Sequence, residues 1–274
     1  MDALNNMKNL KSSLSDLREL FERTITVKHI AEPLISFDSN HPADEVQQFM
    51  EERDYDVIGV RNNGLISGYA RKVDLSGSLL GKYVISFEQE DLLVDTNPLL
   101  DVLERLRNVS RAFVVILGRV GGIVTRGDLQ KTPVRMWLFG LISLIEMQLL
   151  RLIREYYPDD SWKYLISPHR LELAKNLLLD RKRRNEAIDL ADCLQFGDKR
   201  DIVLKTEELL RSVGFESKKK GQAVLKDLEE LRNDLAHAQE IIKARWPGVV
   251  ELATKAEAML RGFERTVVTQ TLAA

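Results

Sequence analysis

Cysteine is almost absent from this chain of 274 residues, in which Cys193 is the single example. One cysteine excludes an intramolecular disulfide and a metal site built from several thiolates, and it fits a reducing compartment such as the cytoplasm. Histidine is also scarce, with four residues. Because His29, His41 and His169 have no partners at metal-ligand spacing, we expect no metal site. Seven prolines and fifteen glycines exclude collagen-like and proline-rich classes.

A long apolar run is missing as well. The best candidate, residues 136–150, is interrupted by Glu146 and Gln148 and is shorter than the roughly 18 residues that a membrane span needs. The N-terminus carries charged residues in place of an apolar signal core. We therefore expect a cytoplasmic protein without a membrane segment.

The chain has little excess charge, with a net charge of −2, which excludes a globally basic nucleic-acid binder. The charge is nevertheless unevenly distributed. Residues 1–130 contain 15 Lys and Arg against 20 Asp and Glu (net −5), and the remainder contains 25 against 22 (net +3). This asymmetry, in a chain long enough for two domains, indicates two modules with different partners.

Residues 1–24 have the pattern of an amphipathic helix. Apolar side chains recur at the helical period on a polar background: Leu4, Met7, Leu10, Leu14, Leu17, Leu20 and Phe21. This spacing predicts a helix over residues 2–24 with one apolar face, which we expect to dock on another part of the protein.

Residues 25–131 alternate short β-branched runs with short helical stretches, and the order strand, helix, strand, strand occurs twice. We place the two copies at residues 25–79 and 80–131. A constant offset of 54 relates Gly64, Gly68 and Asp74 to Gly118, Gly122 and Asp128 (118 − 64, 122 − 68, 128 − 74). Two copies in register indicate an internal repeat.

The second copy ends its last strand with Gly122-Ile-Val-Thr125-Arg126-Gly-Asp128. This segment resembles the cystathionine-β-synthase (CBS) motif, which has a glycine, two apolar residues, a hydroxyl residue and an aspartate three positions later. The tandem therefore resembles a CBS pair, or Bateman module. The resemblance covers residues 25–131 and implies an α+β domain of two βαββα-type repeats that binds an adenosine nucleotide (AMP, ADP, ATP or a related compound) as a regulatory ligand.

The first copy keeps Gly68 and Asp74 but has Arg71 where the family usually has a hydroxyl residue. The resemblance implies two clefts, one served by each aspartate. The first cleft would favour additional phosphates or be empty, because Arg71 and Lys72 replace the usual pattern with positive charge.

These residue types suit a nucleotide. Asp74 or Asp128, at the start of a helix, can accept hydrogen bonds from ribose hydroxyls, and a glycine before it permits close approach. The Thr125 hydroxyl can donate to a phosphate, which free N–H groups at a helix N-terminus also favour, and Arg126 adds a suitable charge. An aspartate at this position can equally be a helix cap, and the sequence leaves that alternative open.

From Thr132 onward every apolar pattern is helical, so we assign residues 132–274 to an all-α bundle. The expected helices are residues 134–156, 168–179, 183–194, 199–213, 218–245 and 248–268. Cys193 falls at an apolar helix position and is expected in the core rather than as a nucleophile.

The helix expected at residues 218–245 has the most regular apolar face. The residues of that face are Val224, Leu225, Leu228, Leu231, Leu235, Ala238 and Ile242. Asn233 and His237 lie on the opposite side and Arg232 lies at the edge of the apolar arc, about 140° from His237 on a straight helix.

The segment Arg232-Asn233-Asp234-Leu235-Ala236-His237 resembles the Arg-x4–6-His signature of the HEPN superfamily (higher eukaryote and prokaryote nucleotide-binding). The resemblance implies metal-independent RNA cleavage. His237 would act as general acid or base at the ribose 2′-hydroxyl, Arg232 would stabilise the charged phosphate, and Asn233 would orient a group in the site. Toxins of this superfamily that are modified on tyrosine carry a Tyr shortly after the His, but Ala-Gln-Glu follows His237 here.

Three functions remain open. The first is a nucleotide-regulated endoribonuclease, in which a homodimer or larger homo-oligomer pairs two motif helices around an RNA substrate. The second is a non-enzymatic nucleotide sensor that acts through a partner, and the third is a helical domain that binds or transfers nucleotide. The basic runs at residues 181–184 and 218–220 can line an RNA path or be solvated faces. None of the three functions requires a catalytic cofactor.

Overall fold

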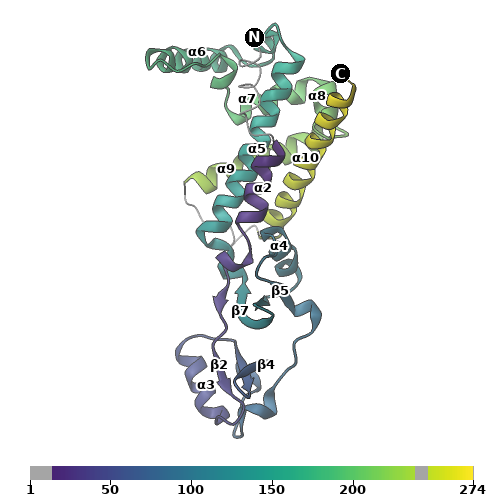
Figure 1. Cartoon of the computed structure of the whole chain (residues 1–274). Helices are drawn as coiled ribbons and strands as arrows, with labels where there is room; N and C mark the ends of the chain where they lie inside the picture. The colour runs from purple at the N-terminus through teal and green to yellow at the C-terminus, as the bar shows by residue number, and fades with distance from the viewer. Residues whose placement is uncertain (1–13, 238–245, 274) are drawn as a thin grey trace. The chain divides into compact units, whose positions relative to one another are not determined.

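The computed structural model describes residues 14–237 and 246–273. The chain divides into two compact units. One is Glu22–Val134, which we call the repeat unit, and the other combines Met1–Phe21 with Arg135–Ala274, which we call the helical unit. Figure 1 shows strands in the first and helices throughout the second.

The repeat unit contains the predicted order of strand, helix, strand, strand twice. The first copy consists of β2 (Ser36–Asp38), α3 (Ala43–Glu52), β3 (Val57–Asn62) and β4 (Leu65–Arg71). The second copy consists of β5 (Leu92–Val94), α4 (Leu99–Asn108), β6 (Arg111–Ile116) and β7 (Arg119–Thr125). The offset is 56 at the helices (99 − 43) and 54 at the hairpins (111 − 57), because the second copy has two fewer residues between its helix and its hairpin. The mixed α/β repeat predicted from the sequence is thus confirmed.

Each copy forms its own sheet around a parallel pair and a hairpin. In the first, β2 runs parallel to β3, which pairs antiparallel with β4. In the second, β5, β6 and β7 repeat this arrangement, and the two-residue strand β1 (Glu32–Pro33) adds to β7. The parallel pairs need a crossover, which α3 and α4 supply.

The segments that precede the two copies are exchanged between them. Residues 26–33 precede the first copy but pair with the second, whereas residues 79–85 precede the second copy but pair with the first. The pairs that make these crossings are Thr26 with Pro98, Glu32 with Ile123, Leu79 with Pro42 and Ile85 with Tyr69. This exchange makes each copy depend on the other, and it was not predicted from the sequence.

An aromatic cluster joins the two copies. The Tyr69 and Phe113 rings, from β4 and β6, lie 4.7 Å apart between centroids, and Phe87 lies 4.7 Å from Phe113. Phe113 is 1% exposed and packs with Leu34 and Val57. Aromatic pairs at these separations contribute beyond their buried area, so the copies share one core at this point.

The two hairpins have the same turn with different residues. Asn63 and Gly64 have φ values of +51° and +77°, and Leu117 and Gly118 have the same values. Two positive φ values are typical of a type I′ turn, which favours Asn-Gly. Leu117 is 96% exposed, so the leucine occupies a left-handed position without a buried contact to compensate.

Leu117→Asn is therefore expected to raise the free energy of unfolding by about 1 kcal/mol, because asparagine tolerates the left-handed region that disfavours leucine. Urea denaturation would measure the change. The first copy supplies the reverse control, since Asn63→Leu should lower stability by a similar amount. Identical unfolding midpoints for both variants and the parent would contradict this account.

The helical unit is built of α-helices in the part of the chain that the structure describes. Its α-helices are α2 (Leu14–Thr24), α5 (Thr132–Tyr156), α6 (Pro168–Arg183), α7 (Phe196–Lys205), α8 (Glu207–Ser212), α9 (Lys218–Ala236) and α10 (Trp246–Ala273). Ser167 and Ser217 cap the N-termini of α6 and α9 by accepting from backbone N–H groups. The core includes Trp137 and Trp162, which are 1% and 0% exposed. The predicted helical C-terminal region is confirmed, with different boundaries.

Three predicted helices in this unit were wrong. The helix predicted over residues 183–194 does not form, because α6 ends at Arg183, Asn185 adopts a φ of +60° and only Ala191–Cys193 make a 3-10 turn. The helix predicted over residues 199–213 is two helices, because Thr206 takes an extended conformation. The helix predicted over residues 218–245 ends at Ala236, and the residues that follow His237, with Ala238 and Ile242 of the expected apolar face, lie outside the described part of the chain.

The described part of the N-terminal helix, α2, docks through part of the expected apolar face, since Leu14 is 8% exposed and Phe21 packs on α5, and also through a charged residue. Leu20, assigned to the apolar face, is 60% exposed, whereas Arg18 is 9% exposed. The Arg18 guanidinium lies 3.2 Å from the carboxylate of Glu257 on α10. The ring of Phe21 packs over Gly140 on α5, where any Cβ would collide with it. A charge pair and a glycine notch therefore hold α2. Leu4, Met7 and Leu10 lie outside the described residues.

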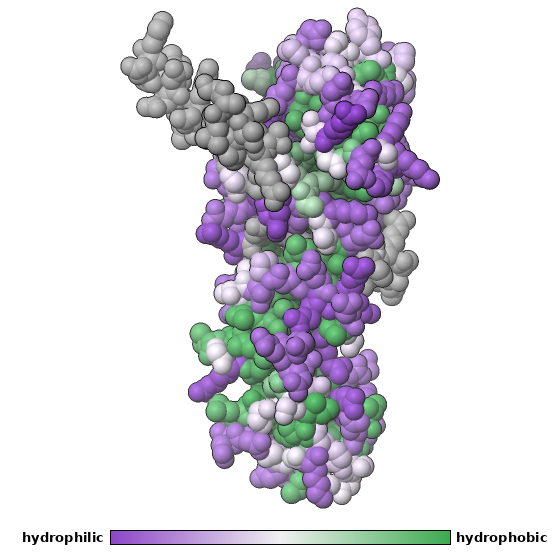
Figure 2. Space-filling view, turned by 90° about the vertical axis from the view of Figure 1, so that its right-hand side faces the viewer, coloured by the Kyte–Doolittle hydropathy of each residue, from purple (hydrophilic) through white to green (hydrophobic). Residues whose placement is uncertain are grey.

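Helix α5 is long and apolar enough to cross a membrane by length and composition, and 61% of its apolar stretch is buried in the structure. A mostly buried apolar helix is typical of the core of a soluble protein. On the face drawn in Figure 2, hydrophilic and apolar residues are interspersed.

Candidate functional site

The turn after β7 brings together two of the residues predicted to bind a nucleotide. Asp128 lies three residues after Thr125 in a short 3-10 helix, Arg126–Gln130. Its Oδ2 atom accepts from the Thr125 backbone N–H at 2.7 Å and from the Thr125 hydroxyl at 2.9 Å. The side chain is 11% exposed. The capping role that the sequence left open is therefore present in the structure.

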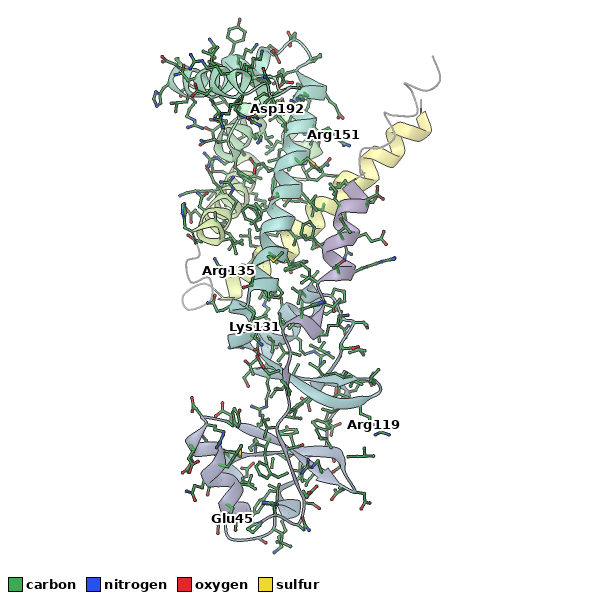
Figure 3. All side chains as sticks on the ribbon, turned by 60° about the vertical axis from the view of Figure 1, so that its left-hand side comes forward. Glu45, Arg119, Lys131, Arg135, Arg151 and Asp192 are labelled. Atoms are coloured by element: carbon green, nitrogen blue, oxygen red, sulfur yellow. The ribbon has the colours of Figure 1, made fainter. Side chains whose placement is uncertain are left out.

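Lys131 completes this turn and was not predicted. Its ammonium lies 2.9 Å from Oδ1 of Asp128, donates to the Ile30 carbonyl at 2.6 Å and pairs with the Glu32 carboxylate. An ammonium has three N–H donors, so these three acceptors use all of them. Partial burial by itself lowers the pKa of Lys131, but the hydrogen bonds to Asp128 and Glu32 outweigh it, and the pKa lies above its ordinary value. Figure 3 labels Lys131 directly before α5.

The corresponding turn of the first copy is more open. Nε of Arg71 donates to Oδ2 of Asp74 at 2.6 Å, and the two side chains are 49% and 33% exposed. The hydrogen bond to Asp74 raises the pKa of Arg71. Arg71 thus supplies to Asp74 the side-chain donor that Thr125 supplies to Asp128. The position equivalent to Lys131 is Gly77 (131 − 54), so the first copy has no ammonium there.

Arg126 and Lys72, expected near phosphate, differ in what they contact. Arg126 donates from Nε to the Leu106 carbonyl at 2.9 Å and from Nη2 to the Arg107 carbonyl at 3.3 Å. These carbonyls end α4, and a cation there complements the helix dipole. The backbone carbonyl of Lys72 accepts from Gln47 at 3.3 Å. The Arg126 guanidinium therefore caps the C-terminal end of α4.

Gly68 and Gly122 permit a close approach, but the groups that approach them are backbone carbonyls of this chain. A Cβ at Gly68 would lie 2.5 Å from the Ile85 carbonyl oxygen, and one at Gly122 would lie 3.3 Å from the Glu32 carbonyl oxygen. Ile85 and Glu32 belong to the two exchanged segments. Both glycines therefore admit the strand that crosses from the other copy.

The helical motif lies at the C-terminal end of α9. His237 follows the last helical residue and is exposed, with a φ of −94° and a ψ of 13°. Asn233 is exposed and Arg232 is half-buried, with Nη1 of Arg232 3.4 Å from Oδ1 of Asn233. His237 is the C-cap residue of α9, and its backbone N–H still donates to the Asn233 carbonyl at 3.0 Å.

Arg135 closes this end of α9. It donates to the Asp234 carbonyl at 3.3 Å and to the Leu235 carbonyl at 3.0 Å. A cation at a helix C-terminus satisfies carbonyls that have no partner within the helix. The motif is thus anchored by a residue from the first turns of α5, labelled in Figure 3.

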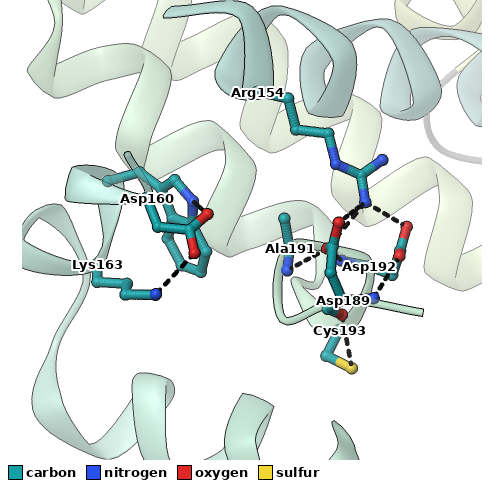
Figure 4. A network of polar contacts seen from close by, with 8 residues as sticks. Arg154, Asp160, Lys163, Asp189, Ala191, Asp192 and Cys193 are labelled. Carbon is teal, nitrogen blue, oxygen red and sulfur yellow. Dashed lines mark hydrogen bonds and ion pairs between the residues drawn. The ribbon is translucent and has the colours of Figure 1, made fainter. Parts of the chain in front are cut away.

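Other candidate groups have structural partners. In the basic run at residues 181–184, Arg181 pairs with Glu186 and Arg183 with Asp180. Cys193 is 3% exposed and burial raises the pKa of its thiol, which agrees with a core role. Arg154 holds the loop that precedes Cys193, because its Nη2 atom lies 2.8 Å from a carboxylate oxygen of Asp189 and of Asp192. Figure 4 shows these ion pairs.

The described residues contain no group of three or more His, Cys, Asp or Glu that could hold a metal ion.

The described residues also form two hollows that the sequence did not indicate. One of about 540 Å³ lies beside α4 in the repeat unit and is lined in part by Glu90, Asp101 and Glu104. The other, of about 740 Å³, lies between the α8–α9 turn and α10 and includes Phe215 and Met259. Residues 90–109 line the first, whereas the second joins residues 212–224 to residues 255–262.

No family model matches the chain, and no curated protein matches it. Solved structures do. The CBS domain of the bacterial CNNM/CorC family Mg2+ transporter in complex with ATP is 18% identical, with a TM-score of 0.34, and the match covers 42% of this chain and 91% of that one. CBSX2 in complex with AMP is 19% identical, with a TM-score of 0.36, over 40% of this chain and 97% of that one. CBSX2 from Arabidopsis thaliana is 18% identical, with a TM-score of 0.36, over 41% of this chain and 96% of that one.

Proposed function

We propose that the repeat unit binds an adenosine nucleotide and that binding regulates the helical unit. The observation that carries this proposal is the turn after β7, where the backbone N–H and the hydroxyl of Thr125 and the ammonium of Lys131 each lie within 3 Å of the Asp128 carboxylate. A ribose offers hydroxyl donors to the same carboxylate. The resemblance of this segment to a CBS motif implies that the nucleotide contains adenosine.

The first copy offers a second and different site. Asp74 and Arg71 are both more exposed than their counterparts, so a ligand can reach them without rearrangement. Arg71 and Lys72 would favour a phosphorylated ligand there. We therefore propose two separate sites, with Asp128 and Thr125 in one and Asp74, Arg71 and Lys72 in the other.

Asp128→Ala is expected to weaken nucleotide binding by about 1–3 kcal/mol, the loss that follows removal of a charged hydrogen-bond acceptor. Calorimetric titration of the intact protein with AMP and with ATP would measure it. Asp74→Ala is the matched variant and should alter a separate binding event. Thermal unfolding of both variants shows whether each protein remains folded. If the intact parent protein gives no heat with either nucleotide, the sensor function is wrong.

A second candidate function is metal-independent RNA cleavage by the helical unit. The observation that favours it is the end of α9, where Asn233 and His237 are exposed and Nη1 of Arg232 lies 3.4 Å from Oδ1 of Asn233. His237 would transfer the proton, Arg232 would stabilise the charged phosphate, and Asn233 would orient a group in the site. A second copy of the chain would supply the opposing motif of a composite cleft. Incubation with total RNA, with and without AMP and ATP, separates this enzyme from a non-enzymatic sensor.

A further inference from the structure

Lys131 ties together two segments of the repeat unit. Its ammonium lies 2.9 Å from Oδ1 of Asp128 in the turn after β7, and it binds the Ile30 carbonyl and the Glu32 carboxylate in the exchanged segment 26–33. The Lys131 side chain is 32% exposed, whereas that of Asp128 is 11% exposed. The lysine is therefore the partner of Asp128 that can move into solvent.

The two segments lie next to the two chain connections between the units. Residues 26–33 follow the connection at Phe21 and Glu22, and Lys131 precedes the connection at Val134 and Arg135. Helix α5 begins at Thr132, directly after Lys131. One ammonium in the repeat unit thus holds the incoming and outgoing segments together.

The carboxylate of Asp128 has few positions left for a ligand. Oδ2 accepts from the N–H and the hydroxyl of Thr125, which belong to the same turn. Oδ1 is paired with Lys131. A carboxylate offers about four lone-pair positions, and three of those of Asp128 are occupied. A ribose that donates both of its vicinal hydroxyls needs two positions, so the second must come from Lys131, because the donors of Thr125 cannot leave without opening the turn.

We propose that a nucleotide bound at Asp128 displaces Lys131 and so releases the segment 26–33 from the turn that leads into α5. This inference rests on the proposed nucleotide site and assigns its regulatory contact. Displacement links occupancy of the site to the two connections, since the same ammonium serves the aspartate and the Ile30 and Glu32 acceptors. The first copy, with Gly77 in place of the lysine, binds without this effect.

Lys131→Met is expected to bind AMP or ATP about five- to tenfold more tightly than the parent protein, because the ligand no longer competes with a partly buried ion pair. Calorimetric titration of the full chain measures the change. Lys28→Met is the matched control, since Lys28 is an exposed lysine of the exchanged segment 26–33 and its removal should leave the affinity unchanged.

Hydrogen exchange provides the structural readout. In the parent protein, nucleotide should speed exchange of the Ala31 and Leu34 amides, which donate to the Val27 and Gly121 carbonyls at 2.9 Å. Lys131→Met should show the faster exchange without nucleotide. Glu32→Gln, which removes one anchor of the lysine and retains its pair with Asp128, should show a smaller effect in the same direction and serves if Lys131→Met does not fold.

The outcomes separate the two proposals. Tighter binding with faster exchange supports the displacement of Lys131. Nucleotide binding that Lys131→Met leaves unchanged or weakens overturns the displacement and leaves the nucleotide site in place. Unchanged exchange of Ala31 and Leu34 on nucleotide addition also overturns it. If neither the parent nor the variant binds nucleotide, both the proposed function and this inference are wrong.

Discussion

An Arg18→Met protein is expected to lose about 3–5 kcal/mol of unfolding free energy, the cost of leaving a buried charge without its partner. Glu257, on α10, is 3% exposed, and its carboxylate lies 3.2 Å from the Arg18 guanidinium. Removing the arginine leaves that carboxylate in a site from which water is largely excluded. Chemical denaturation monitored by circular dichroism would measure the loss.

Two further variants test whether burial is the cause. Arg211→Met removes an ion pair with Glu207 in which both side chains are at least 70% exposed, and it should cost less than about 1 kcal/mol. The double variant Arg18→Met with Glu257→Leu should recover most of the stability, because no uncompensated charge remains. A loss in Arg18→Met no larger than in Arg211→Met would contradict the assignment.

The repeat was predictable because its signals are local. Short β-branched apolar runs define β3 and β6, turn residues define the hairpins, and the helix in each copy is marked by its own period. The constant offset of 54 required no knowledge of the fold, because glycine and aspartate recur at the same positions of both copies.

The exchange of segments was not predictable in the same way. The strand β1 has two residues, Glu32 and Pro33, and its partner β7 lies about ninety residues later. Two residues carry no period, and a pairing at that separation depends on the fold as a whole. The burial of Arg18 was not predictable for the same reason, because its partner Glu257 is far along the chain. From the sequence alone, a single arginine in an amphipathic helix is expected on the solvent-exposed face.

The candidate site was predictable in part. Thr125 and Asp128 lie together as expected because three residues separate them in one turn. Lys131 is also three residues from Asp128, and that spacing was a usable signal. Arg126 was assigned to phosphate from its charge alone, and its partners, the carbonyls at the end of α4, are set by tertiary structure. Helix α9 was extended too far because its apolar period continues past Ala236 in the sequence.

His237→Ala is expected to reduce RNA cleavage by about 10²–10⁴-fold, the contribution of a general acid–base group. Arg232→Ala should reduce it by a similar factor, because its guanidinium would stabilise the developing charge on phosphorus oxygens. Gel analysis of labelled RNA would measure both rates. His169→Ala is the matched control, since His169 is another exposed histidine of the helical unit and should leave cleavage unchanged.

The chemistry of the products tests the same mechanism. Attack by the ribose 2′-hydroxyl leaves a 2′,3′-cyclic phosphate, so DNA should remain intact, and cleavage should persist in EDTA because proton transfer by His237 requires no metal. His237 is exposed and outside the helix, so its replacement should leave the thermal unfolding curve unchanged and the loss of rate would report chemistry alone. Cleavage that EDTA abolishes, or that His237→Ala performs at the parent rate, would leave the nucleotide sensor as the function of this chain.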